Sequence, residues 1–129
     1  MEINFLAVIL SGLAFFLVGG IWYGPLFGKA WQAENKLTDQ DLATRNMALV
    51  FGLAFLLALF SAFNLAMFLG KDPSLGLILT ATIGTGVGFI ATAFGIVYLF
   101  EKKSLKLFLI NAGYFVVAYL VMGAIFWLL

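Results

Sequence analysis

The stretch that decides the fold runs from residue 75 to residue 100 and reads LGLILTATIGTGVGFIATAFGIVYLF. It has no charged side chain and exceeds the roughly 20 apolar residues that a helix needs to cross a bilayer. Residues 82–86, TIGTG, have the spacing of a potassium-channel filter loop, but a filter is non-helical backbone between separate helices. A phosphate-binding loop is less favoured still, because the glycines follow no strand and lack a P-loop lysine. We predict one spanning helix.

The composition of the whole chain agrees with a membrane location. Of 129 residues, 64% are hydrophobic and 10% charged, with a mean hydropathy of +1.13, whereas soluble domains carry about 25% charged residues. Cys and His are both absent, which removes disulfides, thiolate and imidazole catalysis and the usual zinc sites, so no cofactor or metal is expected. The net charge of +1 gives no reason to expect nucleic acid.

Four apolar stretches predict an all-α, polytopic membrane protein, with residues 1–129 as a single transmembrane domain. The first stretch starts beside Glu2 instead of a basic segment, so we interpret it as a retained span and not as a secretory signal. The fold class is a four transmembrane helix bundle with a short interfacial helix between the first two spans. The predicted spans are residues 3–23, 47–69, 75–100 and 107–129, and the interfacial segment is residues 26–36.

The connections between spans carry local signals. Gly24-Pro25 is expected to end the first helix, because proline lacks a donor and restricts the residue before it. Thr38 with Asp41 three residues on resembles a capping box, which predicts that the second helix begins near Asp39 and projects out of the membrane. Short turns at residues 71–74 and 101–104 predict antiparallel neighbours.

Basic residues predict the orientation, since Lys and Arg are held on the cytoplasmic side. We expect the loops at residues 24–45 and 101–106 to be cytoplasmic and both termini to lie outside, in a bacterial inner membrane. This bias also argues against insertion in both orientations. The predicted cytoplasmic residues are Lys29, Lys36, Arg45, Lys102, Lys103 and Lys106, against Lys71 alone on the other side.

Small residues recur on the faces of the predicted helices, and in a bilayer such residues let helices approach closely. Gly84 and Gly88 form GxxxG, and Gly86 projects from a different side, so the third helix is expected to meet neighbours on two faces and to be the most buried. The predicted packing residues are Gly20, Gly24, Ala54, Ala58, Ala62, Gly84, Gly88 and Gly95.

Only neutral polar groups occur inside the predicted spans. Counting 1.5 Å per residue from the helix ends places six of them in the outer half of the membrane. They are either a small cavity that opens outward or hydrogen-bonded contacts between helices, and Ser61 and Asn64 share a face from which they could bond the threonines of the third helix. The six residues are Ser11, Ser61, Asn64, Thr80, Thr82 and Tyr119.

Two smaller groups complete the candidate sites. Asn111 and Tyr114, near the cytoplasmic end of the fourth span, form a second polar patch or part of the packed core. Trp22, Tyr23 and Trp31 are predicted to be interface anchors, because amphipathic rings favour the headgroup region.

The absence of ionisable residues in the spans limits the function. Proton-coupled exporters generally need such a residue at depth, and small multidrug transporters of similar size carry a glutamate in their first helix, whereas Glu2 lies only at the terminus here. Fluoride channels have four helices of similar length but insert in both orientations, which the charge bias opposes.

Four stretches together resemble the small bacterial membrane proteins grouped as domain-of-unknown-function family 1761. The resemblance implies a four-helix integral membrane protein and brings no established activity, cofactor or site residue. The stretches are GGIWYGPLFGKAW (19–31), LTDQDL (37–42), SLKLFLINAGY (104–114) and MGAI (122–125).

We therefore expect a non-enzymatic membrane protein that forms a homo-oligomer in the lipid bilayer and binds or passes a small neutral solute. The alternative is a structural or lipid-interacting subunit that docks a protein partner through the loop at residues 24–45. Catalysis is the least favoured class, because the acidic residues of that loop have no His, Cys or metal-binding neighbour.

Overall fold

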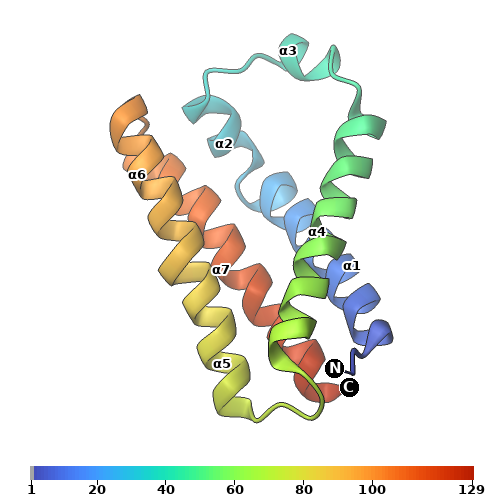
Figure 1. Cartoon of the computed structure of the whole chain (residues 1–129). Coiled ribbons are helices and arrows are strands. Elements are labelled where there is room, and N and C mark those ends of the chain that lie inside the picture. Colours follow the sequence, from blue (N-terminus) through green and yellow to red (C-terminus); the bar gives the residue numbers. More distant parts are fainter. Residues whose placement is uncertain (1) are drawn as a thin grey trace.

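The computed structural model describes residues 2–129, and all regular structure in that range is helical. Four rods cross the molecule, each long and apolar enough to span a bilayer: Phe5–Leu26, Met47–Leu69, Leu75–Glu101 and Leu105–Leu128 (Figure 1). The predicted all-helical fold, with four helices long and apolar enough to span a membrane, is confirmed. The elements are α1 (Phe5–Ile21), η1 (Trp22–Leu26), α2 (Gly28–Glu34), α3 (Asp39–Ala43), α4 (Met47–Leu69), α5 (Leu75–Ile83), η2 (Gly84–Ala91), α6 (Thr92–Glu101) and α7 (Leu105–Leu128), where η denotes a π-helix.

The first span continues past Gly24-Pro25, contrary to the prediction. Residues Trp22–Leu26 widen into the π-helix η1 with Pro25 inside it, and the Phe27 N–H donates to the Trp22 carbonyl at 2.8 Å. A wider turn relieves the clash between a proline ring and the preceding turn, so the helix passes the proline and breaks at Phe27. The helix α2 then lies within the predicted segment of residues 26–36.

The helix of the second span begins at Met47 and does not extend back to Asp39, contrary to the prediction from the capping box. The capping box exists: the Asp41 N–H donates to Thr38 Oγ1 at 3.1 Å, and the Thr38 N–H donates to Asp41 Oδ2 at 2.8 Å. These bonds to Thr38, and the nearby Arg45, hold the pKa of Asp41 below its usual range. The box starts only the short α3, however, because Asn46 accepts from the Leu49 N–H and caps α4 separately.

The fourth span forms the centre of the bundle. α7 packs against α1 on one side and against α5 and η2 on the other, while α4 packs mainly against α1. In α7, 39% of the most apolar stretch is buried, against 6% in the third span, so the prediction that the third helix is the most buried is wrong. In Figure 1, the turn at residues 70–74 joins the end of α4 to the start of α5, and the two spans separate towards the other end of the bundle.

The glycines divide into a buried and an open set. A Cβ built on Gly86 would lie 3.1 Å from the Val116 Cα, and one on Gly123 would lie 2.9 Å from the side chains of Ile78 and Thr82, so these glycines allow α5 and η2 to approach α7. The predicted packing residues Gly20, Gly24, Gly84 and Gly88 have no atom of the described chain, residues 2–129, within 4 Å of such a Cβ.

The remaining predicted packing residues differ in their surroundings. Ala58 and Ala62 are buried, as packing residues should be, whereas Ala54 is exposed. Gly95 faces the Phe108 ring, which would lie 3.4 Å from an added Cβ. Within residues 2–129, the third span thus packs mainly against α7, on the side of Gly86 and Gly95, and Gly84 and Gly88 make no close contact with another span.

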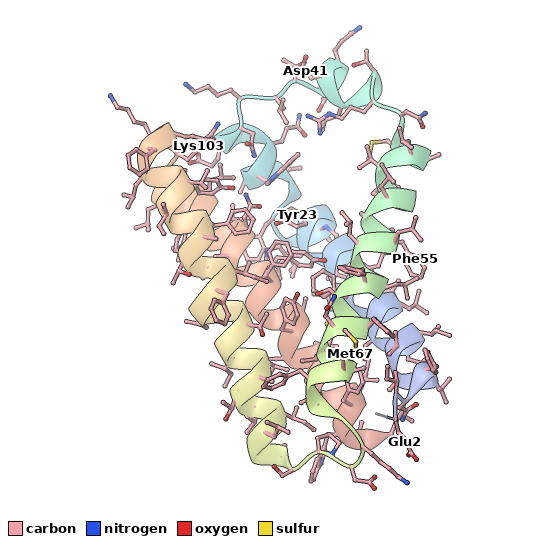
Figure 2. The ribbon with its side chains drawn as sticks, in the orientation of Figure 1. Glu2, Tyr23, Asp41, Phe55, Met67 and Lys103 are labelled. Atoms are coloured by element: carbon pink, nitrogen blue, oxygen red, sulfur yellow. The ribbon has the colours of Figure 1, made fainter. Side chains whose placement is uncertain are left out.

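The two ends of the bundle have different character. At one end, which we call the termini end, Lys71 Nζ lies 3.2 Å from Glu2 Oε2, beside the last residues of α7. Figure 2 shows Asp41 and Lys103 at the opposite end, which we call the basic end. The basic end holds Lys29, Lys36, Arg45, Lys102, Lys103 and Lys106.

Candidate functional site

A groove between α4 and α5 gathers most of the predicted polar layer. It encloses about 470 Å³, and Tyr119 of α7 contributes to its lining. Ser61 and Tyr119 share a hydrogen bond that ties α4 to α7. We call this feature the α4–α5 groove; it is lined by Ser61, Asn64, Leu65, Phe68, Thr80, Ala81, Gly84, Thr85, Phe89 and Tyr119.

Four of the six predicted residues of the layer line this groove, and two do not. Ser11 is fully buried, and its Oγ has no hydrogen-bond partner within residues 2–129. Thr82 is also buried and donates to the Ile78 carbonyl at 2.8 Å. The structure therefore brings together Ser61, Asn64, Thr80 and Tyr119, which reach the groove from three of the four spans.

The expected bonds from Ser61 and Asn64 to the threonines of the third span are not formed. Asn64 Nδ2 donates to the Phe60 carbonyl at 2.8 Å, and Thr80 Oγ1 donates to the Gly76 carbonyl at 2.8 Å. Both are bonds to the preceding turn of the same helix, which short polar side chains make readily. Within residues 2–129, no donor is bonded to Asn64 Oδ1, and the bond between Ser61 and Tyr119 uses only one of their two hydroxyl hydrogens.

The layer as predicted omitted Thr85, which the structure places in the groove. Thr85 lies ten residues from the start of α5 at Leu75, about 15 Å along the helix, so counting by depth put it near the middle of the membrane and not in the outer half. Phe68 and Phe89, on the two walls, were also missed because exposed phenylalanine in a spanning helix is ordinary.

A second polar cluster joins three spans nearer the basic end. The Tyr23 hydroxyl donates to Asn111 Oδ1 at 2.6 Å, and Asn111 Nδ2 donates to the Tyr98 hydroxyl at 2.6 Å. Asn111 on α7 thereby connects η1 to α6. The predicted patch of Asn111 and Tyr114 is thus two separate contacts, because the Tyr114 hydroxyl donates instead to the Phe15 carbonyl at 2.9 Å.

Two of the three predicted interface anchors turn their polar atoms inward. Trp22 Nε1 donates to the Ile110 carbonyl at 2.8 Å, and Figure 2 shows Tyr23 within the bundle. The Tyr23 ring meets the Trp31 ring edge-on at 6.0 Å. Both side chains reach α7, where a polar group finds a partner that lipid cannot supply.

A further hollow of about 500 Å³ lies at the termini end. It is lined by loop and terminal residues, among them Glu2, Lys71 and Asp72. The ion pair of Glu2 and Lys71 is well exposed, and such pairs contribute little to stability. Among residues 2–129, no group of acidic side chains is arranged to hold a metal ion. The α4–α5 groove is therefore the candidate functional site.

The fold and the groove define a class: a four-span integral membrane protein with an uncharged, partly polar groove between two of its spans. The chain belongs to the family described as "Protein of unknown function (DUF1761)", which it matches over residues 6–127. The resemblance drawn from the sequence motifs is confirmed. No curated protein and no solved structure gives a significant match to the chain.

Proposed function

We propose that this protein is a non-enzymatic, self-associating membrane protein that binds or passes a small uncharged solute through the α4–α5 groove. The observation that carries the proposal is the groove itself, in which Ser61, Asn64, Thr80 and Tyr119 meet at membrane depth. Its volume is comparable to the roughly 300–1,000 Å³ of small-molecule sites.

The lining of the groove favours a neutral occupant. None of its lining residues is Asp, Glu, Lys or Arg, and a charged group inside a bilayer is costly unless it is paired. The groove instead offers hydroxyl and carboxamide groups between apolar walls. Catalysis is not part of the proposal, because these side chains include no general base or activated nucleophile.

The open glycines support self-association. Gly20 and Gly24 lie on the first span, yet no atom of another part of residues 2–129 lies within 4 Å of an added Cβ. Ala54 is exposed as well. Small residues left free on a spanning helix suit close contact with another helix. Crosslinking of the protein in native membranes tests this, and a strict monomer under those conditions contradicts it.

The orientation follows from the basic end. We propose that the basic end, with the loops at residues 24–45 and 101–106, faces the cytoplasm of a bacterial inner membrane and that both termini face outward, because positive residues resist translocation. The chain has no cysteine, so single-cysteine variants report accessibility cleanly. Labelling of Lys103→Cys from outside intact cells contradicts the proposed orientation.

Flux of a small neutral solute tests the function. In proteoliposomes that hold the protein, we expect glycerol to equilibrate faster than in empty liposomes, and Asn64→Leu to reduce that excess rate at least about tenfold, because it removes the carboxamide of the groove and fills its space. Thr92→Val is the matched control, since Thr92 is exposed and bonds its own helix outside the groove. Equal rates in Asn64→Leu and wild type contradict the proposal.

A partner-binding role is the second candidate, and the order of the basic-end loop favours it. Ser104 donates to Glu34, which fastens α2 to the start of α7, and Gln32 Nε2 donates to Asp39 Oδ1 at 2.8 Å. A loop held in this way offers a defined surface. Substitution of Glu34 and Ser104 distinguishes this role from the first. If the variant keeps its glycerol flux but loses a protein that copurifies with wild type, the partner-binding role is favoured.

A further inference from the structure

The rim of the α4–α5 groove is apolar and faces sideways. Phe68 on α4 and Phe89 on η2 flank it, with 66% and 75% of their surfaces exposed. Both belong to spanning segments, so exposed faces of these rings meet acyl chains. A solute that arrives from water would have to pass this rim, whereas a molecule already dissolved in the bilayer reaches the groove directly.

The polar groups of the groove lie at hydrocarbon depth. Asn64 is five residues and Ser61 eight residues from the end of α4 at Leu69, which corresponds to about 8 and 12 Å along the helix. The hydrocarbon core is about 30 Å thick, so both side chains lie inside it. Asn64 is nevertheless exposed, and an exposed carboxamide at such depth gains from a partner that acyl chains do not provide.

The free hydrogen-bonding capacity has a definite pattern. Within residues 2–129, Asn64 donates to Phe60, and no donor is bonded to its Oδ1, which remains a free acceptor. Ser61 and Tyr119 share one bond, which uses one of their two hydroxyl hydrogens and leaves the other as a free donor. Positions three residues apart on a helix lie about 5–6 Å from one another, so a single oxygen can bridge Ser61 and Asn64.

We propose that the natural occupant of the α4–α5 groove is an uncharged membrane amphiphile, a long apolar chain that carries a hydroxyl group, and that it enters sideways from the bilayer. A hydroxyl matches the pattern because it both accepts from the Ser61–Tyr119 pair and donates to Asn64 Oδ1. The tail then lies along the rim formed by Phe68 and Phe89. This inference rests on the proposed function and names the solute class of the same site.

Substitution of Gly84 tests whether the proposed occupant binds in the groove. Gly84 lines the groove, its backbone is right-handed helical, and within residues 2–129 no atom beyond its own helix backbone lies within 4 Å of an added Cβ. Gly84→Leu therefore fills the groove without a clash at Cβ. Gly88→Leu is the matched control: Gly88 lies in the same π-helix, is equally open, and does not line the groove.

The experiment is photolabelling in lipid nanodiscs with three probes of equal chain length that carry a diazirine: a hexadecanol, a hexadecane and a hexadecanoate. We expect the alcohol to label α4 and η2 of wild type and Gly88→Leu at least about fivefold more than the alkane or the carboxylate does. Gly84→Leu should lose that excess, and Asn64→Leu should reduce alcohol labelling to the alkane level. The thermal midpoints of both glycine variants show whether they remain folded, and Gly84→Ala replaces Gly84→Leu if the larger residue unfolds the protein.

Alcohol labelling no stronger than alkane labelling overturns the inference, as does full labelling of a folded Gly84→Leu. If glycerol flux still depends on Asn64, the proposed function then survives without the amphiphile; if flux is also absent, both fail. Disulfide dimers of single-cysteine Phe68→Cys that block labelling identify a second copy of the chain as the occupant, which also overturns the inference.

Discussion

Replacing Gly86 with leucine is expected to destabilise the protein by about 3 kcal/mol, because overpacking typically costs 1–3 kcal/mol and here the obstacle is backbone. A Cβ at this position lies 3.1 Å from the Val116 Cα and 3.7 Å from the Phe115 carbonyl oxygen. Backbone atoms of α7 cannot rotate aside, so η2 must move away from α7. The free energy of unfolding, measured by titration with SDS in mixed micelles, reports the effect.

Gly88→Leu, two residues further along the same helix, is the control for this prediction. No atom of residues 2–129 lies within 4 Å of a Cβ there, so the variant should match wild type or exceed it by up to about 1 kcal/mol from helix propensity. Equal stability of the two variants would show that η2 does not approach α7 at Gly86.

Asn111→Leu is expected to cost about 1–3 kcal/mol. Asn111 accepts from Tyr23 and donates to Tyr98, so its loss breaks two bonds and leaves two hydroxyl groups unpaired. Interhelical hydrogen bonds in membranes average about 0.6 kcal/mol and reach about 1.7, and leucine of similar volume limits any cavity contribution. The same unfolding titration measures the change.

Tyr114→Phe provides the comparison, since it removes a single bond to the Phe15 carbonyl and should cost about 0.6 kcal/mol. A double-mutant cycle between Asn111→Leu and Tyr98→Phe isolates the coupling across α6 and α7. If the free energy of unfolding of Asn111→Leu lies within about 0.3 kcal/mol of the wild-type value, the cluster does not hold the three spans together.

The four spans were predictable because apolar segments of this length can cross a bilayer only as helices, whose backbone groups are all hydrogen-bonded within the segment. Two of the helix boundaries depend on local competition that the pattern does not reveal. Pro25 was expected to break a helix that instead widens around it, and the capping box at Thr38 starts a helix that ends before Asn46 caps the next. Both local signals are present in the sequence, but the sequence does not show how far the helix on either side of each signal extends.

The packing of the glycines could not be read from spacing alone. Gly84 and Gly88 have the familiar GxxxG separation, yet Gly86 between them is the residue that meets α7. The spacing shows which residues share a face, whereas the choice of face depends on the neighbouring spans.

The polar residues were partly predictable for a similar reason. Depth along each helix correctly grouped Ser61, Asn64, Thr80 and Tyr119, because depth depends only on the count of residues from a helix end. The other two residues, Ser11 and Thr82, differ in their rotation about the helix axis, which buries them in the packed core. The pattern also did not reveal the hydrogen bond from Tyr23 to Asn111, because that bond depends on how the first and fourth spans pack.

The most direct test of the central claim is an experimental density map of the wild-type protein in lipid nanodiscs, at a resolution that separates side chains. We predict α4 and α5 apart at Asn64 and Thr80, with elongated non-protein density between Phe68 and Phe89 that ends against Ser61 and Asn64. A map in which α4 closes on α5, so that side chains of this chain fill the space beside Gly84, would contradict the account.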